Sequence, residues 1–288
     1  MCDTIFGRER NQQSFANKYF INHIYNNFKK LVTQEGFAWW YRNGFMHSSA
    51  AAVEKKIRLM GFSYYFPVPF NVAYCWIDCN CLECDVVGGG PAEQGANALR
   101  WDESIQRAFY NGWKSTHGLK HQTVNNAYGC VVDIEGPWTL RRNDMTLLRI
   151  SEINDRMRDL QVGEPTQCII FGDSAYKVLS HLSTYLNDAQ VIPGVLAPEY
   201  RAAYNSSMKR TRISIEWDYG HTSTLFKYLT TQDKLKLMIS DEIAKVYTVA
   251  TILKNLHVIL YGCETSNYFE LQFLDGLIDY YMNLEDLP

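Results

Sequence analysis

The sequence predicts an α/β fold with a central mixed sheet flanked by helices, a small helical N-terminal region and C-terminal helices. Two apolar runs, Val72–Ile77 and Gln167–Phe171, have the length of buried strands. A hairpin pattern lies between these two runs. Apolar residues also recur at helical spacing near both ends of the chain. Strands and helices that share one sheet in this way are typical of a mixed α/β architecture.

The amino-acid composition is that of a globular protein, and the net charge limits the classes of function. The chain has 288 residues, 47% of them hydrophobic, which is enough for one large domain or two modest ones. The net charge is −3, whereas an independent DNA-binding module is normally basic. Nuclease chemistry is not excluded, because a metal-binding cluster of acids lowers the net charge and local basic patches matter more than the sum.

Residues 1 to about 70 are predicted to be mainly helical. Apolar residues recur at helical spacing within Gln13–Val32. A second helix is expected over Ala50–Met60, with Ser48 or Ser49 as its N-terminal cap. A cluster of large aromatic residues lies between the two helices and is interpreted as core packing, with a nucleic-acid or partner surface as the alternative: Trp39, Trp40 and Tyr41.

The remaining elements follow from runs and turn signals. Two strand-like stretches are joined by a turn-forming segment, residues 125–129, and form the predicted hairpin. A loop with glycine and proline at Gly88–Pro91 precedes them. The predicted strands and helices are Leu119–Val124, Cys130–Ile134, Met145–Leu160, Pro198–Tyr228, Ser240–Leu260 and Tyr268–Leu284.

Two acids end the two predicted buried strands. Asp78 follows the first run, and Asp173 follows the second after one glycine. An acid in this position lies at the rim of the sheet, where α/β folds bind ligands. If the strands are neighbours, the two carboxylates converge and need a counter-charge, which Mg²⁺ or Mn²⁺ supplies through hard oxygen ligands. The alternative is a turn residue or a helix cap, and Asp173 is placed to cap a helix.

A third acid, Glu216, lies inside the long predicted helix. Lys209 and Arg212 fall near the same helical face, at spacings of three and four residues. One interpretation is a ladder of ion pairs on the protein surface. The other is a metal ligand whose neighbouring cations hold phosphates.

Five segments in order along the chain resemble a known family. They are Cys75–Asp78, Tyr110–Gln122, Tyr128–Asp144, Gly172–Tyr176 and Arg212–Gly220. The last two resemble motifs of the form GDSAY and R..IE..FG. Together the segments resemble the nuclease domain of PIF/Harbinger-type transposases, which belong to the DDE superfamily of endonucleases. The resemblance covers about residues 72–285.

The resemblance implies an RNase H-like nuclease domain over residues 71–286, with residues 1–70 as a remnant of a DNA-binding part. It implies two divalent metal ions, Mg²⁺ or Mn²⁺, that cleave phosphodiester bonds by in-line displacement. The implied catalytic residues are Asp78, Asp173 and Glu216. The same three acids are implied metal ligands together with Asp144, which the residues alone would identify as a helix cap.

The resemblance also implies partners and a location. DNA is the implied substrate, and the implied phosphate contacts would be independent of DNA sequence. A separate DNA-binding partner protein and a homo-oligomer are further candidates, no membrane is expected, and the location is intracellular, nuclear or cytoplasmic. The implied phosphate contacts are Lys114, Lys120, Arg141, Arg142, Lys209 and Arg212.

The chain departs from the family pattern in two places. Cys79 follows the first acid where the family has Asp-Gly-Thr, and Asn143 and Met145 flank Asp144 where the family has His-Asp-Ser. About 70 residues precede the first acid, so much of a separate DNA-binding region is expected to be missing. A domesticated or degenerate transposase-derived binding protein without catalytic activity is therefore the alternative function.

The cysteines suggest a second kind of metal site. A zinc site would use thiolates in pairs, but only one CxxC spacing occurs, so reduced free thiols are the preferred interpretation. The apolar stretch Ala244–Cys263 contains two lysines and a histidine and is predicted to be an amphipathic helix, not a membrane span. The clustered cysteines are Cys75, Cys79, Cys81 and Cys84.

Overall fold

The computed structural model describes most of the chain in eight stretches. Cys84, the loop at Gly88–Pro91 and the predicted domain boundary near residue 70 lie outside them. The described residues are 10–62, 73–83, 85–86, 107–164, 168–186, 198–230, 236–237 and 243–287.

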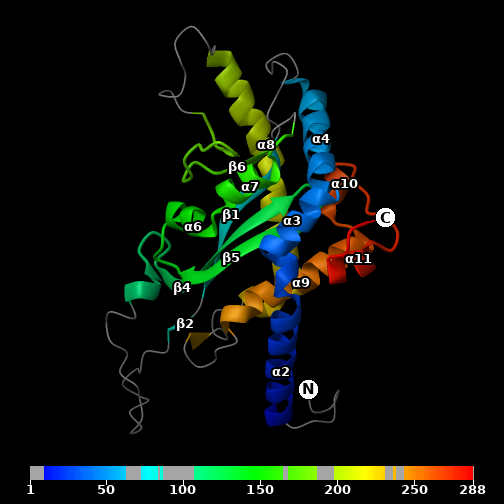
Figure 1. Ribbon diagram of the computed structural model, residues 1–288. Coiled ribbons are helices and arrows are strands. Elements are labelled where there is room, and N and C mark those ends of the chain that lie inside the picture. The colour runs from blue at the N-terminus through cyan, green and yellow to red at the C-terminus, as the bar shows by residue number, and fades with distance from the viewer. Residues whose placement is uncertain are drawn as a thin grey trace.

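The centre of the fold is a six-stranded mixed sheet, as the sequence predicts (Figure 1). Its strand order is β3-β4-β1-β6-β7, and β5 pairs with β4 outside this path. β1 runs antiparallel to β4 and parallel to β6. A separate pair joins β2 (Asp85–Val86) to β8 (Lys236–Leu237). The strands of the main sheet are β1 (Ala73–Glu83), β3 (Tyr110–Asn111), β4 (Thr116–Asn126), β5 (Val131–Thr139), β6 (Ile169–Gly172) and β7 (Leu182–Ser183).

Helices precede, interrupt and follow the sheet in the chain. Short helical segments of other types occur at Lys29–Val32, Arg58–Phe62 and Lys227–Thr230. The α-helices are α2 (Arg10–Phe28), α3 (Gln34–Arg42), α4 (Phe45–Ile57), α6 (Asp144–Ser151), α7 (Ile153–Leu160), α8 (Pro198–Leu225), α9 (Ile243–Tyr261), α10 (Glu264–Tyr268) and α11 (Leu277–Asn283).

The contacts of β1 assign helices to the two faces of the sheet. Side chains along a strand point alternately to opposite faces. Cys75 contacts Met46 of α4, with 3.6 Å between the two sulfur atoms. Asp78 is three residues further along β1 and therefore points to the other face, where it pairs with Arg212 of α8. We call these two sides the α4 face and the α8 face.

The neighbouring strand β4 extends the same division. Thr123 lies opposite Asp78, and its hydroxyl lies 2.9 Å from the Tyr219 hydroxyl of α8. His121 points the same way, and its ring contacts the Tyr247 ring of α9 with 4.6 Å between the centroids. Gln122 points to the α4 face, where it donates to the Ser151 hydroxyl of α6. The sheet is thus covered by α4 and α6 on one face and by α8 and α9 on the other (Figure 1).

The predicted aromatic cluster lies in the core. Trp39 and Trp40 are buried in α3, and both rings contact Tyr281 of α11. The Trp39 indole also donates to the carbonyl of Glu285 at 2.6 Å. α3 and α4 share one hydrophobic cluster with β1, β5 and β6. Core packing is therefore the confirmed interpretation of this cluster.

Several predicted boundaries differ from the structure. The second helix begins at Phe45, so Ser49 lies inside it and is buried, where its hydroxyl accepts the N–H of Ala127 in the β4–β5 turn. The predicted helix Met145–Leu160 is two helices, because Glu152 adopts a left-handed φ of 51° between them. Within the predicted final helix, Tyr268–Leu284, only α11 is helical beyond Tyr268, the residue at which α10 ends.

The hairpin turn depends on a glycine. Gly129 has a φ of 81° and packs against Cys263, whose sulfur would lie 2.3 Å from a Cβ at this position. Both observations exclude a larger residue without a shift of the backbone. The predicted hairpin is confirmed, with strands longer than the sequence indicated.

One described helix, α9, is long and apolar enough to cross a membrane. Most of it is buried against the sheet, and Lys254 and Asn255 in its middle are fully buried. The Asn255 side chain hydrogen-bonds both backbone groups of Val131 in β5. This is the packing of a core helix in a globular protein.

Candidate functional site

The register of the sheet brings two of the predicted acids side by side. β1 and β6 are parallel neighbours, and their last paired residues are Ile77 and Gly172. Asp78 and Asp173 are the next residue in each strand. β1 does not end at Asp78, as predicted, but continues to Glu83 paired with β4 alone. Asp78 thus marks the point where β1 leaves β6 and its carboxylate gains space.

The Asp78 carboxylate has two protein partners. One oxygen accepts the backbone N–H of Cys79 at 2.8 Å. The other accepts from the guanidinium of Arg212, which extends from α8. Both partners of this ion pair are mostly buried, with 18% of the Asp78 side chain and 16% of the Arg212 side chain exposed.

Glu216 joins this pair from the same helix. It lies one turn after Arg212, with 3.5 Å between Oε1 of Glu216 and Nη1 of Arg212. The Glu216 side chain remains 64% exposed. The Arg212–Glu216 pair of the predicted ladder is present, but Arg212 is mostly buried because it also reaches Asp78 on β1.

Charge repulsion connects the acids electrostatically. Burial raises the pKa of Asp78, and the ion pair with Arg212 and the Cys79 N–H partly offset this effect. The carboxylates of Asp173 and Asp144 raise the same pKa further. Asp173 itself accepts the N–H of Ala175 at 2.6 Å, as a turn residue does. We call Asp78, Asp173 and Glu216, gathered around Arg212, the carboxylate cluster.

Asp144 lies elsewhere, on the α4 face. It is the first residue of α6, and the cap is its neighbour Asn143, whose side chain accepts the N–H of Thr146 at 2.8 Å. Its own carboxylate accepts from the ammonium of Lys120, at 2.8 Å. Lys120 and Thr123 are three residues apart in β4, so their side chains lie on opposite faces of the sheet and Lys120 points away from α8. Asp144 thus approaches the carboxylate cluster from the opposite face of the sheet, and, in addition to burial, its charge still raises the pKa of Cys79 and of Asp78.

A family comparison identifies this arrangement. A family model described as DDE superfamily endonuclease matches residues 98–255, which is more than half of the chain. The chain belongs to this family. The match includes Asp144, Asp173 and Glu216, whereas Asp78 lies before it and is placed by strand pairing. No curated protein and no solved structure matches the chain.

Members of the DDE superfamily typically use divalent metal ions, so the fit of such an ion was tested against the side chains. The donors are carboxylates, the hard oxygen ligands that Mg²⁺ and Mn²⁺ prefer, and two of them leave adjacent parallel strands. Among the described residues, no three His, Cys, Asp or Glu side chains form a group that could hold a metal ion. The Asp78 oxygen that would bind the ion accepts from Arg212. The residues therefore fit such an ion in the chemistry of their donor atoms, and in this structure Arg212 supplies the positive charge beside Asp78.

The predicted phosphate contacts of this DDE endonuclease fall into two groups. Lys114, Arg141, Arg142 and Lys209 are exposed. Lys120 and Arg212 are mostly buried and engage the acids described above. Both buried cations were implied as phosphate contacts by the resemblance, and the sequence carries no signal for their pairing with Asp144 and Asp78.

An exposed indole accompanies the exposed cations. Trp113 lies in the turn between β3 and β4 and is 94% exposed. The Asn111 side chain accepts the N–H groups of Trp113 and Lys114 at 3.0 and 3.1 Å. The same side chain donates to the carbonyl of Leu140, next to Arg141. The turn is therefore held in place, and we call Trp113, Lys114, Arg141 and Arg142 the basic turn surface.

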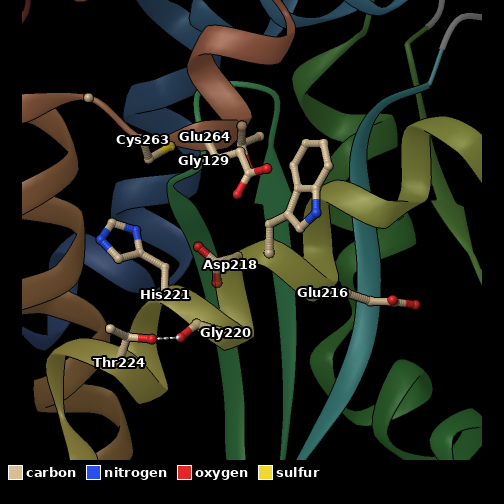
Figure 2. A pocket seen from close by; sticks show the side chains of 11 residues that line it. Gly129, Glu216, Asp218, Gly220, His221, Thr224, Cys263 and Glu264 are labelled. Atoms are coloured by element: carbon tan, nitrogen blue, oxygen red, sulfur yellow. Dashed lines mark hydrogen bonds between the residues drawn. The ribbon is translucent and has the colours of Figure 1, made fainter.

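A pocket of about 440 Å³ lies beside the carboxylate cluster, between α8, α10 and the β4–β5 turn (Figure 2). Glu216 lies at its rim and extends away from the other lining side chains, whereas Asp218 points to the opposite side of α8. Asp218 is buried and paired with Lys254 of α9. This buried pair joins α8 to α9 and was missed by the sequence interpretation, which treated Lys254 as a polar interruption.

Two tyrosines near the acids were also missed. The Tyr176 hydroxyl lies 3.3 Å from the Cys79 sulfur. Burial lowers the pKa of Arg212, but the nearby Asp78, Tyr185 and Asp173 raise it above its usual value. Tyr176 belongs to the motif Gly172–Tyr176, so the sequence did hold a signal for it. Tyr185 lies in no motif.

The cysteine cluster is not arranged as a zinc site in the described residues. Cys75 is fully buried, as predicted, and Cys79 and Cys81 are partly buried. All six cysteines in the described stretches are free thiols. Burial raises the pKa of the Cys75 and Cys79 thiols well above the usual value, so neither is a ready thiolate.

Proposed function

We propose that this DDE endonuclease cleaves DNA phosphodiester bonds at the carboxylate cluster and that it is of the PIF/Harbinger type. One observation carries the proposal: Asp78 and Asp173 follow the last paired residues of two adjacent parallel strands, and α8 brings Arg212 and Glu216 against them. Acids that meet at such a strand edge form a ligand site of α/β folds.

Each acid has a distinct position in the proposed site. Asp78 and Asp173 are fixed by the sheet, so their carboxylates have little freedom to move apart. Glu216 is exposed on a helix and can turn toward or away from them. When bound, Mg²⁺ or Mn²⁺ would polarise the phosphate and lower the pKa of a bound water. The carboxylates would hold the metal ions, and the basic residues would orient the DNA strand through its phosphates.

The basic turn surface supports DNA as the substrate. The chain carries a net charge of −3, yet three exposed cations lie with Trp113 on two segments that the Asn111 side chain joins. Arg142 also stacks over the ring of Trp138 at 4.5 Å, which holds its guanidinium near this surface. Asn143 alone separates Arg142 of this surface from Asp144 along the chain. Such cations bind phosphates without reading the sequence, and exposed aromatic rings stack on unpaired bases.

The proposed DNA substrate leads to proposals about the location, the partners and the domains of the protein. The protein would act in the nucleus or reach DNA from the cytoplasm, and a separate DNA-binding protein would supply target recognition. A homo-oligomer would place two cleavage sites on two DNA ends. Residues 1–70 would be the remnant of a DNA-binding part, and residues 71–286 the nuclease domain.

Plasmid nicking in the presence of Mn²⁺ tests the proposal. The wild-type chain is compared with Asp78→Asn, Asp173→Asn and Glu216→Gln, which remove charge with little change in shape. Each variant is expected to lose at least about 100-fold in rate, because metal-bound carboxylates support several kcal/mol of transition-state stabilisation. Asp155→Asn is the matched control, since Asp155 is an exposed acid that pairs with the exposed Arg158 on α7.

Circular dichroism and thermal melting confirm that the variants are folded. Loss of nicking in the three cluster variants, with normal nicking by Asp155→Asn, supports the site. Normal nicking by Asp173→Asn would remove the carboxylate cluster from the mechanism. A folded wild-type chain that neither binds Mn²⁺ nor nicks DNA would favour a transposase-derived binding protein without catalytic activity.

A further inference from the structure

We propose that Arg212 is a tethered counter-ion, which neutralises Asp78 until a divalent cation enters the carboxylate cluster and is then released to a DNA phosphate. This inference rests on the proposed function, because it concerns the same site. It assigns Arg212 a role in metal binding that differs from a fixed phosphate contact.

The contacts of Arg212 place one cation among three acids. Its guanidinium pairs with Asp78 on β1 and lies 3.5 Å from Glu216 on its own helix. The negative charge of Asp173 also acts on it. Among the described residues, Arg212 is the cation that the ion pairs place in this cluster.

The charge balance explains why this arrangement can exchange. Three ionised carboxylates and one guanidinium leave two negative charges uncompensated. Arginine cannot lose its proton in a protein, so it compensates Asp78 at every accessible pH. A divalent cation carries twice the charge of a guanidinium and is preferred by carboxylate oxygens. Its entry therefore requires that Arg212 give up the oxygen of Asp78.

The released side chain has a defined place to go. Glu216 is largely exposed, so Arg212 can remain beside it while its guanidinium turns toward solvent. A planar guanidinium suits bidentate contact with phosphate. Metal binding and phosphate binding would then strengthen each other, and thermodynamic linkage requires that the effect be reciprocal.

The alternative is a permanent salt bridge that fixes α8 to β1. A permanent bridge would hold Arg212 on Asp78 with and without metal. Its removal would loosen the cluster and weaken metal binding. The two alternatives therefore predict opposite signs for the effect of removing the charge of Arg212.

Calorimetry of Mn²⁺ binding in the absence of DNA distinguishes the exchange of Arg212 from a permanent salt bridge. Arg212→Gln is expected to bind Mn²⁺ about tenfold more tightly than wild type, which corresponds to about 1.4 kcal/mol. Lys209→Gln is the matched control, because it removes the same charge one turn earlier on α8. It is expected to change the affinity by no more than about twofold, since an exposed charge is screened by salt.

Weaker or unchanged Mn²⁺ binding by Arg212→Gln, with normal binding by wild type, would overturn the exchange and leave the proposed function intact. Absence of Mn²⁺ binding by both proteins would overturn the proposed function and the inference with it.

A second measurement uses the wild-type chain and does not depend on the folding of a variant. The side-chain Nε–H of Arg212 is buried and has no hydrogen-bond partner among the described residues. Its resonance in ¹⁵N spectra is expected to shift, and its hydrogen exchange to accelerate, when Mg²⁺ is added. Arg212→Lys identifies the resonance by its loss. A resonance that is unchanged at saturating Mg²⁺ would show a permanent bridge.

Discussion

Two basic side chains determine the state of the predicted acids at the residue scale. Arg212 neutralises Asp78, and Lys120 neutralises Asp144. Partly buried carboxylates need a positive partner, and the sequence interpretation supplied that partner as a metal ion. Lys120 donates to the carbonyl of Arg142 as well, so its contact with Asp144 is part of the link between β4 and α6.

Asp144 is therefore expected to act mainly through Lys120. Asp144→Asn should lower the free energy of unfolding by about 1–3 kcal/mol, because it leaves a mostly buried ammonium without its ionic partner. Adding Lys120→Met should recover part of this loss. Urea unfolding measures both effects, and Mn²⁺ affinity should change much less than in Asp173→Asn. An equal loss of Mn²⁺ affinity in Asp144→Asn and Asp173→Asn would place Asp144 at the metal instead.

Strand pairing is the decisive feature at the element scale. The two buried strands were predictable, because short apolar runs bounded by turn signals are typical of buried strands. That β1 and β6 are neighbours was assumed from the sequence but not predicted. The pairing of the two strands confirms the assumption. The extension of β1 beyond Asp78 was not predictable, because Cys79, Asn80 and Cys81 lack strand periodicity and pair through their backbones with β4.

Helix boundaries show the same limit. Nothing in the periodicity of Met145–Leu160 reveals the left-handed Glu152 that divides it. Ser49 has the composition of a cap but is used inside α4 to hold a turn that is distant in sequence. The Asp218–Lys254 pair joins two helices that periodicity treats separately. Long-range partners, which one sequence does not display, decided each of these cases.

The turn between β3 and β4 leads to a prediction about DNA contact. Trp113→Ala should weaken binding of a single-stranded oligonucleotide in EDTA by about 1–3 kcal/mol, the range for loss of one base stack. Trp113→Phe should retain most of the affinity, because a ring remains. Fluorescence anisotropy of the labelled oligonucleotide measures both variants. Tyr261→Ala is the control, since Tyr261 is an exposed aromatic residue at the end of α9; an equal loss in this variant would refute a specific stack.

At the scale of the whole molecule, the described residues form one large hydrophobic core and a smaller cluster of Leu119, Ile243 and Tyr247. The N-terminal helices α3 and α4, the sheet and α11 all contribute to the large core. The sequence predicted the α/β class and the order of the elements, which composition and periodicity report well. It did not reveal that the aromatic residues of α3 and α11 would pack together, because they are more than 200 residues apart.

A buried histidine makes the stability of the whole molecule sensitive to acid. Burial lowers the pKa of His121 to about 3, so the folded chain does not take up the proton that the unfolded chain binds below about pH 6.5. Stability from this group is present at neutral pH and is lost as the pH falls from about 6.5 toward 3. At pH 5 the loss is about 2 kcal/mol.

Urea unfolding at pH 7 and pH 5 measures this loss. The difference between the two pH values should be about 2 kcal/mol smaller in His121→Gln than in the wild-type chain. His47→Gln is the control, because His47 is exposed on α4. If His121→Gln and the wild-type chain lose the same stability, His121 is not the residue responsible.

The contact between Trp39, Trp40 and Tyr281 has a consequence for how the protein is made. Synthesis proceeds from the N-terminus, and parts of a chain can begin to fold while the ribosome is still adding residues. The two indoles of α3 exist long before the tyrosine that covers them. Until residue 281 has emerged, a nascent chain presents an unfilled aromatic surface of the kind that chaperones bind. Release from such helpers should therefore wait until α11 has left the ribosome.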